Sequence, residues 1–329
     1  MDTVSMDTVS MDATDRGLVH ALQIDGRVSF RAVAEVLGVS ENTVARRYRR
    51  LRSSGVLRVV GVVNGVRLGY SSWTLRVRCT PDAAGSIAAA LAARPDTSYV
   101  HLLSGGTEVS CNVQTPTAAE RDALLLDKLP RTSRVTAVSA HLLLRATALP
   151  ATWAGSAHLT EEQVRRLRPT FVPSTTEAVA LDEQDRAMLG ILARDGRAGY
   201  GELGCATGSA DSTAKRRLDA LRRAGVLTFI VDIAPATLGF STEARLWMSV
   251  QPSRLADVAR AMADHPEVSF AAMTTGPSNL VAAVNCRDAE DLCRYLTERV
   301  AALDAIHSME TAPVIRTLKR AGTCTRTPR

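Results

Sequence analysis

The sequence predicts an α+β protein in which one two-part unit occurs twice. Each unit consists of a winged helix-turn-helix followed by a ferredoxin-like βαββαβ domain. Three observations predict this fold. Residues 15–69 match residues 185–239 at a constant offset of 170 without a gap. Each copy opens with short helical patterns around a glycine turn, and each continues with alternating strand and helix patterns.

Composition excludes several classes of protein. The chain has 329 residues, a formal charge of +6 and 46% hydrophobic residues, which is typical of a globular protein of two to four domains. It contains no apolar run of the roughly 20 residues that a membrane helix needs, and no basic-then-apolar leader. We therefore expect a cytoplasmic protein without a membrane partner.

No pattern indicates a metal or cofactor site. The six cysteines form no C-x-x-C pair, and the six histidines are scattered, so zinc-like spacing is absent. Phosphate-loop, nucleophile-elbow, zincin and dinucleotide-binding motifs are absent as well. We expect no cofactor, no metal and no catalytic residue, although enzymes can lack short motifs.

The repeat extends through both parts of the unit. Asp25-Gly26-Arg27 matches Asp195-Gly196-Arg197 in the first part. After a one-residue insertion, Pro95 matches Pro266 and Gly105 matches Gly276 in the second part. The expected domains are a disordered N-terminus at 1–13, helix-turn-helix domains at 14–70 and 181–240, α+β domains at 71–147 and 241–318, a linker at 148–180 and a basic tail at 319–329.

The first helix-turn-helix has its capping signals in order. Ser29 can cap a second helix, Gly38 makes the turn, and Ser40 can cap a third helix that Gly55 ends. On that third helix, apolar side chains at i, i+4 and i+7 form the inward stripe. An arginine-rich face lies opposite and suits the phosphates and guanine edges of double-stranded DNA. The candidate DNA-binding residues here are Ser40, Asn42, Thr43, Arg46, Arg47, Arg49 and Arg50.

Two alternatives stay open for this face. A run of charges is often only a solvated surface. Arg47 lies near the edge of the core, so it is either a DNA contact or a structural ion pair. In the second copy only Arg216 is a candidate, because residues 182–227 carry +1 against +5 for residues 15–60. Asp219 replaces Arg49 there, and a carboxylate repels phosphates, so we expect the second module to bind DNA less well.

The second part of each unit has the order β-α-β-β-α-β. In the first copy we expect strands at 71–80, 97–104, 108–115 and 135–146, and helices at 82–94 and 117–129. A short helix at 160–167 is expected within the linker. A sheet covered on one face needs a partner for the other. We therefore expect self-association, either between the copies in one chain or between chains.

The stretch at 14–69, TDRGLVHALQIDGRVSFRAVAEVLGVSENTVARRYRRLRSSGVLRVVGVVNGVRLG, resembles the N-terminal DNA-binding module of Lrp/AsnC-family transcription regulators. The segments LDEQDRAMLGILARDGRAGYGEL at 181–203 and AKRRLDALRRAGVL at 214–227 resemble it again, and the α+β parts look like that family's ligand-sensing, oligomerising domain. The resemblance implies homo-oligomers built through the α+β domains, DNA binding through 40–50, and a small effector, often an amino acid, near the central turn of each α+β domain. The family's Gly-x-x-Asp pattern ends here in Glu108 and in Asn279. A plain hairpin turn is the alternative at both places. The candidate ligand residues are Ser104, Gly105, Gly106, Thr107 and Glu108, and Thr275, Gly276, Ser278 and Asn279.

The leading hypothesis is a sequence-specific DNA-binding transcriptional regulator controlled by a small effector, and not an enzyme. One alternative is a ligand sensor or partner protein that does not bind DNA. A less favoured one is an enzyme, because siroheme decarboxylases also resemble tandem Lrp-type units. Their Tyr-x-Arg and Asn-Leu-Trp elements are missing here, where Tyr99-Val100-His101 and Asn279-Leu280-Val281 stand instead.

Overall fold

The computed structural model describes residues 11–129, 131–171 and 179–325. Of the N-terminal stretch expected to be disordered, residues 1–10 lie outside this description, whereas Met11 is buried and Asp12 caps the first helix. Parts of the expected linker and basic tail, at 172–178 and 326–329, also lie outside it. Within the described residues, no helix is long and apolar enough to cross a membrane.

The first helix-turn-helix comprises α1 (Ala13–Ile24), α2 (Phe30–Leu37) and α3 (Glu41–Ser53), followed by β1 (Leu57–Val63). The predicted caps are present, since the side chains of Ser29 and Ser40 accept from the backbone N–H three residues on. Gly38 takes the left-handed conformation with φ 68°, which L side chains rarely adopt. Local sequence signals therefore place α3 as predicted.

The second helix-turn-helix comprises α7 (Glu183–Leu192), α8 (Tyr200–Thr207) and α9 (Asp211–Arg223), followed by β6 (Leu227–Ile233). Here Gly199 and Ala210 stand at the N-cap positions of α8 and α9. Neither residue has a side-chain acceptor, so the first turns of both helices lack the cap that stabilises α2 and α3. The module nevertheless keeps the same helix order.

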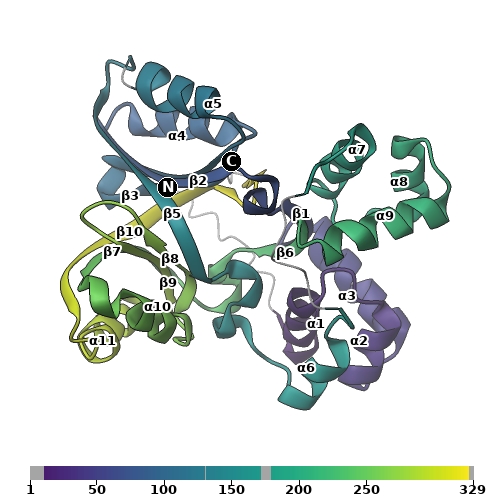
Figure 1. Cartoon of the computed structure of the whole chain (residues 1–329). Coiled ribbons are helices and arrows are strands. Elements are labelled where there is room, and N and C mark those ends of the chain that lie inside the picture. The colour runs from purple at the N-terminus through teal and green to yellow at the C-terminus, as the bar shows by residue number, and fades with distance from the viewer. Residues whose placement is uncertain (1–10, 130, 172–178, 326–329) are drawn as a thin grey trace, which may run out of the picture.

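Strands β1 and β6 join the two modules into one body. They pair antiparallel over their full length, with Val60 opposite Ile230 at the centre. Because these two residues are equivalent in the repeat, a pseudo-two-fold axis passes between them. The strand after each helix-turn-helix thus pairs with its own counterpart. Figure 1 shows both helical modules on the same side of the molecule.

Arginines of each helix-turn-helix module contact the other module, and these contacts come in pairs that the repeat relates. Four contacts follow the repeat, two to backbone carbonyls and two to aspartates. They are Arg27 to the Gly196 carbonyl at 2.8 Å, Arg197 to the Gly26 carbonyl at 2.7 Å, Arg52 to Asp195 at 2.6 Å, and Arg222 to Asp25 at 2.8 Å. The modules are therefore held in a defined two-fold relation within one chain.

The first α+β domain has the predicted βαββαβ order. Its elements are β2 (Ser71–Cys79), α4 (Ala84–Ala93), β3 (Thr97–Leu103), β4 (Glu108–Thr115), α5 (Ala118–Asp122, continued by a π-helical turn at Ala123–Lys128) and β5 (Val135–Ala148). The strands lie in the order β3-β4-β2-β5. The helices cover one face of this sheet (Figure 1).

The second α+β domain repeats this arrangement with β7 (Thr242–Val250), α10 (Leu255–Ala263), β8 (Val268–Thr274), β9 (Leu280–Cys286), α11 (Ala289–Arg294) and β10 (Ile306–Arg320). The strand order is β8-β9-β7-β10. A short β11 (Thr323–Cys324) follows and pairs back onto β10. Lys319 and Arg320, expected to open a basic tail, are therefore the last residues of β10.

The two sheets join at both ends. Strand β5 pairs with β8, and β10 pairs with β3, so each domain's last strand extends across to the other domain. The free faces then enclose a small shared core that includes Leu103, Trp247 and Val281. Self-association of the α+β domains is thus achieved between the two copies in one chain.

The linker packs against the first module. It forms two short turns at Pro150–Thr152 and Ala154–Ser156 and then α6 (Glu161–Leu167), which Thr160 caps as predicted. Gln163 donates to the Val36 carbonyl of α2 at 2.9 Å. Residues 150–167 of the linker are therefore folded against α1 and α2.

Candidate functional site

The outward face of α3 presents two arginines that no carboxylate holds within the described structure. The side chains of Asn42, Arg46 and Arg49 are exposed, while Val44, Tyr48 and Leu51 are buried on the opposite face. Arg49 makes only a hydrogen bond from its Nε to the Ala45 carbonyl of its own helix, at 3.3 Å. These side chains can therefore reach phosphates or base edges.

Ser40 and Thr43 hydrogen-bond to each other at the start of α3. The Ser40 hydroxyl accepts from the Thr43 backbone N–H at 3.1 Å and lies 2.9 Å from the Thr43 hydroxyl. The cap leaves both residues at the helix N-terminus, where backbone N–H groups favour an anion such as phosphate. Their proposed DNA contacts remain a prediction.

Arg47 and Arg50, also proposed as DNA contacts, are held by carboxylates of α1. Arg47 donates to Asp12 at 2.5 Å and to Asp15 at 3.2 Å, and Arg50 donates to Asp15 at 2.5 Å. Asp15 is fully buried, so its charge needs these partners. The structure thus assigns to Arg47 the ion-pair role that the sequence left open, and gives Arg50 the same role.

On α9, Arg217 repeats the role of Arg47, because it donates to Asp182 and Asp185 of α7 at 2.7 and 2.6 Å. Arg216 is exposed as predicted, and so is Lys215. Lys215 occupies the position of Ala45, so the sequence comparison with α3 missed it as a candidate. Arg223, in the last turn of α9, is exposed as well. In the described structure α3 therefore carries two exposed arginines without an ion pair and α9 carries three such cations, although Asp219 stands among those of α9.

The central turn of the first α+β domain is open. Ser104, Gly105 and Gly106 have positive φ values of 51°, 73° and 86°. A Cβ atom added to either glycine would meet nothing within 4 Å. Thr107 is exposed beside them, and its hydroxyl donates to the Ser104 carbonyl at 3.1 Å. A small ligand can approach this backbone closely.

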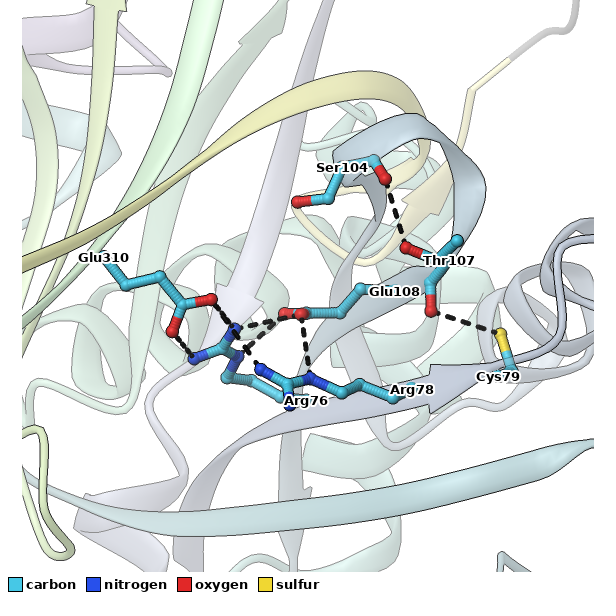
Figure 2. Close-up of polar contacts among 7 residues, drawn as sticks. All are labelled: Arg76, Arg78, Cys79, Ser104, Thr107, Glu108 and Glu310. Carbon is cyan, nitrogen blue, oxygen red and sulfur yellow. Dashed lines mark hydrogen bonds and ion pairs between the residues drawn. The ribbon is translucent and has the colours of Figure 1, made fainter.

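Glu108, the acidic residue after this turn, is buried and paired with Arg76 of β2 (Figure 2). Arg76 donates to both Glu108 oxygens at 2.7 and 2.9 Å, and also to both oxygens of Glu310 on β10. Hydrogen bonds from Arg76 hold the pKa of Glu310 below its usual range. An ammonium ligand at Glu108 would compete with this guanidinium, so the predicted ligand contact stays a prediction.

The second central turn is closed by the first domain. Thr275 exchanges hydrogen bonds with Leu142 of β5, through its backbone N–H and its hydroxyl, at 3.0 Å each. A Cβ on Gly276 would lie 2.3 Å from the ring of His141. The Asn279 side chain pairs with both backbone groups of Val250 at 2.8 Å. In the same turn, the Ser278 carbonyl accepts a hydrogen bond from the Thr274 hydroxyl. Ligand access at Thr275–Asn279 is therefore poorer than at Ser104–Glu108.

The fold and these surfaces define a DNA-binding transcriptional regulator with a ligand-binding domain. Residues 11–52 and 181–222 match the AsnC-type helix-turn-helix domain, and residues 243–323 match the Lrp/AsnC ligand binding domain. An uncharacterized HTH-type transcriptional regulator of Pyrococcus abyssi is 33% identical over 145 residues, which cover 44% of this chain and 91% of that protein. The HTH-type transcriptional regulator FL11 of Pyrococcus horikoshii is 32% identical over 142 residues, or 43% of this chain and 93% of that protein. This chain belongs to the Lrp/AsnC family.

Among solved structures, the siroheme decarboxylase NirDL matches nearly the whole chain. Its TM-score is 0.63 with 15% sequence identity, and the match covers 96% of this chain and 95% of that one. NirDL in complex with an iron-uroporphyrin III analogue matches with the same TM-score and 16% identity. At such identity the likeness shows a shared tandem fold and nothing about chemistry.

Proposed function

We propose that this regulator binds double-stranded DNA as a single chain, with α3 and α9 on one duplex. The β1–β6 ribbon and its reciprocal arginine contacts carry the proposal. They hold two recognition helices in the two-fold relation that dimeric helix-turn-helix proteins use for neighbouring major grooves. The half-sites would differ in sequence, because the outward residues of α3 and α9 differ.

We further propose that α3 contributes more of the affinity than α9. In the described structure, Arg46 and Arg49 on α3 and Lys215, Arg216 and Arg223 on α9 are exposed without an ion pair, but Asp219 lies on α9 where α3 carries Arg49. A carboxylate near phosphates offsets part of the attraction of Lys215 and Arg216. Ion pairs with α1 and α7 orient both helices without adding free charge.

Gel-shift titrations over a range of salt concentrations test this proposal. The variant Arg46→Ala/Arg49→Ala should bind much more weakly, and its slope of log affinity against log salt should flatten by about 1.8, since each lost phosphate contact contributes about 0.9. The matched variant Lys215→Ala/Arg216→Ala should lose less affinity. Loss of binding in the second variant alone would contradict the assignment to α3, and loss in neither would contradict DNA binding through these helices.

For the effector we propose the first turn, Ser104–Glu108, with a small amino acid or a similar molecule as ligand. Its open, glycine-rich backbone supports this choice, whereas His141 and Leu142 cover the second turn. Calorimetric titration with the twenty amino acids is the test. Thr107→Arg should block binding, and the matched Ser278→Arg should leave it unchanged. The reverse result would move the site to the second turn, and no heat from any amino acid would remove this ligand class.

We propose further that the chain is not an enzyme. We also propose that any association between chains occurs in addition to the pairing of the two α+β domains within one chain. The fold likeness to NirDL keeps a tetrapyrrole-binding enzyme as the second candidate function. Titration with iron-uroporphyrin III, followed by its absorbance band, separates the two. An unshifted band supports the regulator, and a shifted band that saturates at one equivalent supports the enzyme. Light scattering without DNA gives the number of chains in the particle.

A further inference from the structure

The pseudo-two-fold axis relates two clefts, each between an α+β domain and a helix-turn-helix module. The cleft of the second α+β domain is filled by the linker. The ring of Trp153, a linker residue, lies 5.0 Å from the ring of Phe240, centroid to centroid. The indole N–H of Trp153 donates to the Pro266 carbonyl at 2.7 Å. Nearby, the Ser156 hydroxyl lies 2.6 Å from the Gln23 amide oxygen of α1. A segment of the chain thus occupies this cleft through an indole ring.

In the part of the chain that the structure describes, the equivalent cleft of the first α+β domain is open. It has a volume of about 780 Å³ and is lined by Tyr70 and Pro95, which are equivalent to Phe240 and Pro266. Leu189 and Ala193 of α7 form the wall opposite. The two walls that hold Trp153 on one side of the molecule are therefore repeated on the other side.

The path of the chain explains why this cleft stays open. After β5 the chain continues into the turns that carry Trp153. After β10 it reverses at Ala321 and Gly322, both with positive φ, and β11 pairs back onto β10. The residues outside the described ranges, 1–10, 130, 172–178 and 326–329, include no aromatic residue. Within the described residues, no indole ring lines this cleft as Trp153 fills the other.

The edge of the open cleft is polar. Lys128 and Arg186 lie at its rim and are exposed, and Glu120 is a third charged lining residue. Arg94, also in the lining, is paired with Asp96 at 2.6 Å. Apolar walls with a few cationic groups at the mouth suit a flat aromatic ligand that carries an acidic group.

We propose that the open cleft binds a small molecule with an indole-type ring and a carboxylate. The ring lies against Tyr70 and the wall of α7, its N–H donates to the Pro95 carbonyl, and its carboxylate faces Lys128 and Arg186. Because α7 belongs to the second helix-turn-helix, the ligand ties that module to the first α+β domain. The site is separate from the turn at Ser104–Glu108, so it does not depend on the effector proposal.

Calorimetric titration of the intact chain with indole-3-acetate, and with indole alone, tests the proposal. We expect one site per chain for each probe, with weaker binding of indole because it lacks the carboxylate. Ala193→Trp should fill the cleft and reduce the affinity at least tenfold. The control Ala187→Trp places the same side chain at an exposed position of α7 outside the cleft lining, and should leave binding unchanged.

A second variant uses the symmetry directly. Trp153→Ala empties the filled cleft, so indole should then bind at two sites per chain. Should this variant fail to fold by circular dichroism, the Ala193→Trp comparison decides alone. Absence of binding by the intact chain at millimolar probe, or full binding by Ala193→Trp, would overturn the proposal.

Discussion

The guanidinium of Arg76 lies 3.8 Å from the centre of the Trp247 ring. These two residues occupy equivalent positions in the two α+β domains, 171 residues apart, and meet where the two sheets face each other. A cation stacked on an indole ring is favourable when both are removed from water. The duplication has therefore diverged at this contact into a complementary pair. Glu108 and Glu310 pair with Arg76, and Arg78 lies near both carboxylates, so the formal charges of this cluster balance.

Removing Arg76 should destabilise the whole fold. Arg76→Leu leaves the buried Glu108 carboxylate without its partner, which costs about 3–5 kcal/mol for a buried pair. The exposed neighbour Arg78 lies 3.7 Å from Glu108, and Arg78→Ala should cost less than about 1 kcal/mol. Urea unfolding measures both values. Adding Glu108→Leu to Arg76→Leu should recover part of the loss, and a purely additive double variant would show that the two residues do not interact.

Introducing a cation on α9 should strengthen DNA binding. Asp219→Arg removes the carboxylate and repeats Arg49 of α3, so one more phosphate contact becomes available. We expect roughly tenfold tighter binding at low salt and a salt slope steeper by about 0.9. Glu290→Arg, exposed on α11 of the second α+β domain and so outside the helix-turn-helix modules, is the control for a general change of net charge. Equal gains from both variants would mean that α9 is not at the interface.

Packing between the two helix-turn-helix modules is tight at Gly26. A Cβ atom there would lie 2.5 Å from the Cβ of Phe229 and 2.9 Å from a methyl of Val59. Gly26→Ala should therefore destabilise the protein by about 1–3 kcal/mol. Gly190, exposed in α7, has nothing within 4 Å of such an atom. Gly190→Ala should stabilise by about 0.5–1 kcal/mol, the usual helix preference for alanine. Thermal unfolding of both variants is the measurement, and a neutral Gly26→Ala would contradict this packing.

Acid should destabilise the protein through His101. Burial lowers the pKa of this histidine well below its usual value, and the nearby charges of Arg245 and Arg320 lower it further. Its ring lies 2.5 Å from Arg245 and 3.0 Å from the Thr317 hydroxyl. The unfolded chain takes up the proton near pH 6.5 while the folded chain does not, so stability falls as pH decreases below that value.

The slope of the unfolding free energy against pH tests this assignment. One histidine contributes at most about 1.4 kcal/mol per pH unit. His20 and His265 also have pKa values lowered by burial, so they act in the same direction. His101→Asn should reduce the slope of unfolding free energy between pH 6.5 and 5 and leave the other two contributions in place. An unchanged slope would mean that His101 is protonated in the folded protein.

Most of the fold could be predicted from the sequence because its signals are local. The caps at Ser29 and Ser40, the turn at Gly38 and the strand 108–115 depend on a few neighbouring residues, and the structure has each where expected. The candidate DNA face was predicted in part. Arg46 and Arg49 have no ion pair in the described structure, whereas Lys215 and Arg223 were missed because the comparison started from the residues of α3, where Ala45 and Ser53 stand.

The sequence by itself determined the helices, the strands, the duplication and the basic character of α3, since helical and strand periods and capping pairs are encoded over short distances. Only the tertiary structure decided which arginines are free, because α1 brings Asp12 and Asp15 to Arg47 and Arg50 and leaves Arg46 and Arg49 to solvent. It also decided that β5 pairs with β8 and β10 with β3. Strand edges carry the same backbone donors and acceptors in every sequence, so their partners are chosen by the packing of the whole chain.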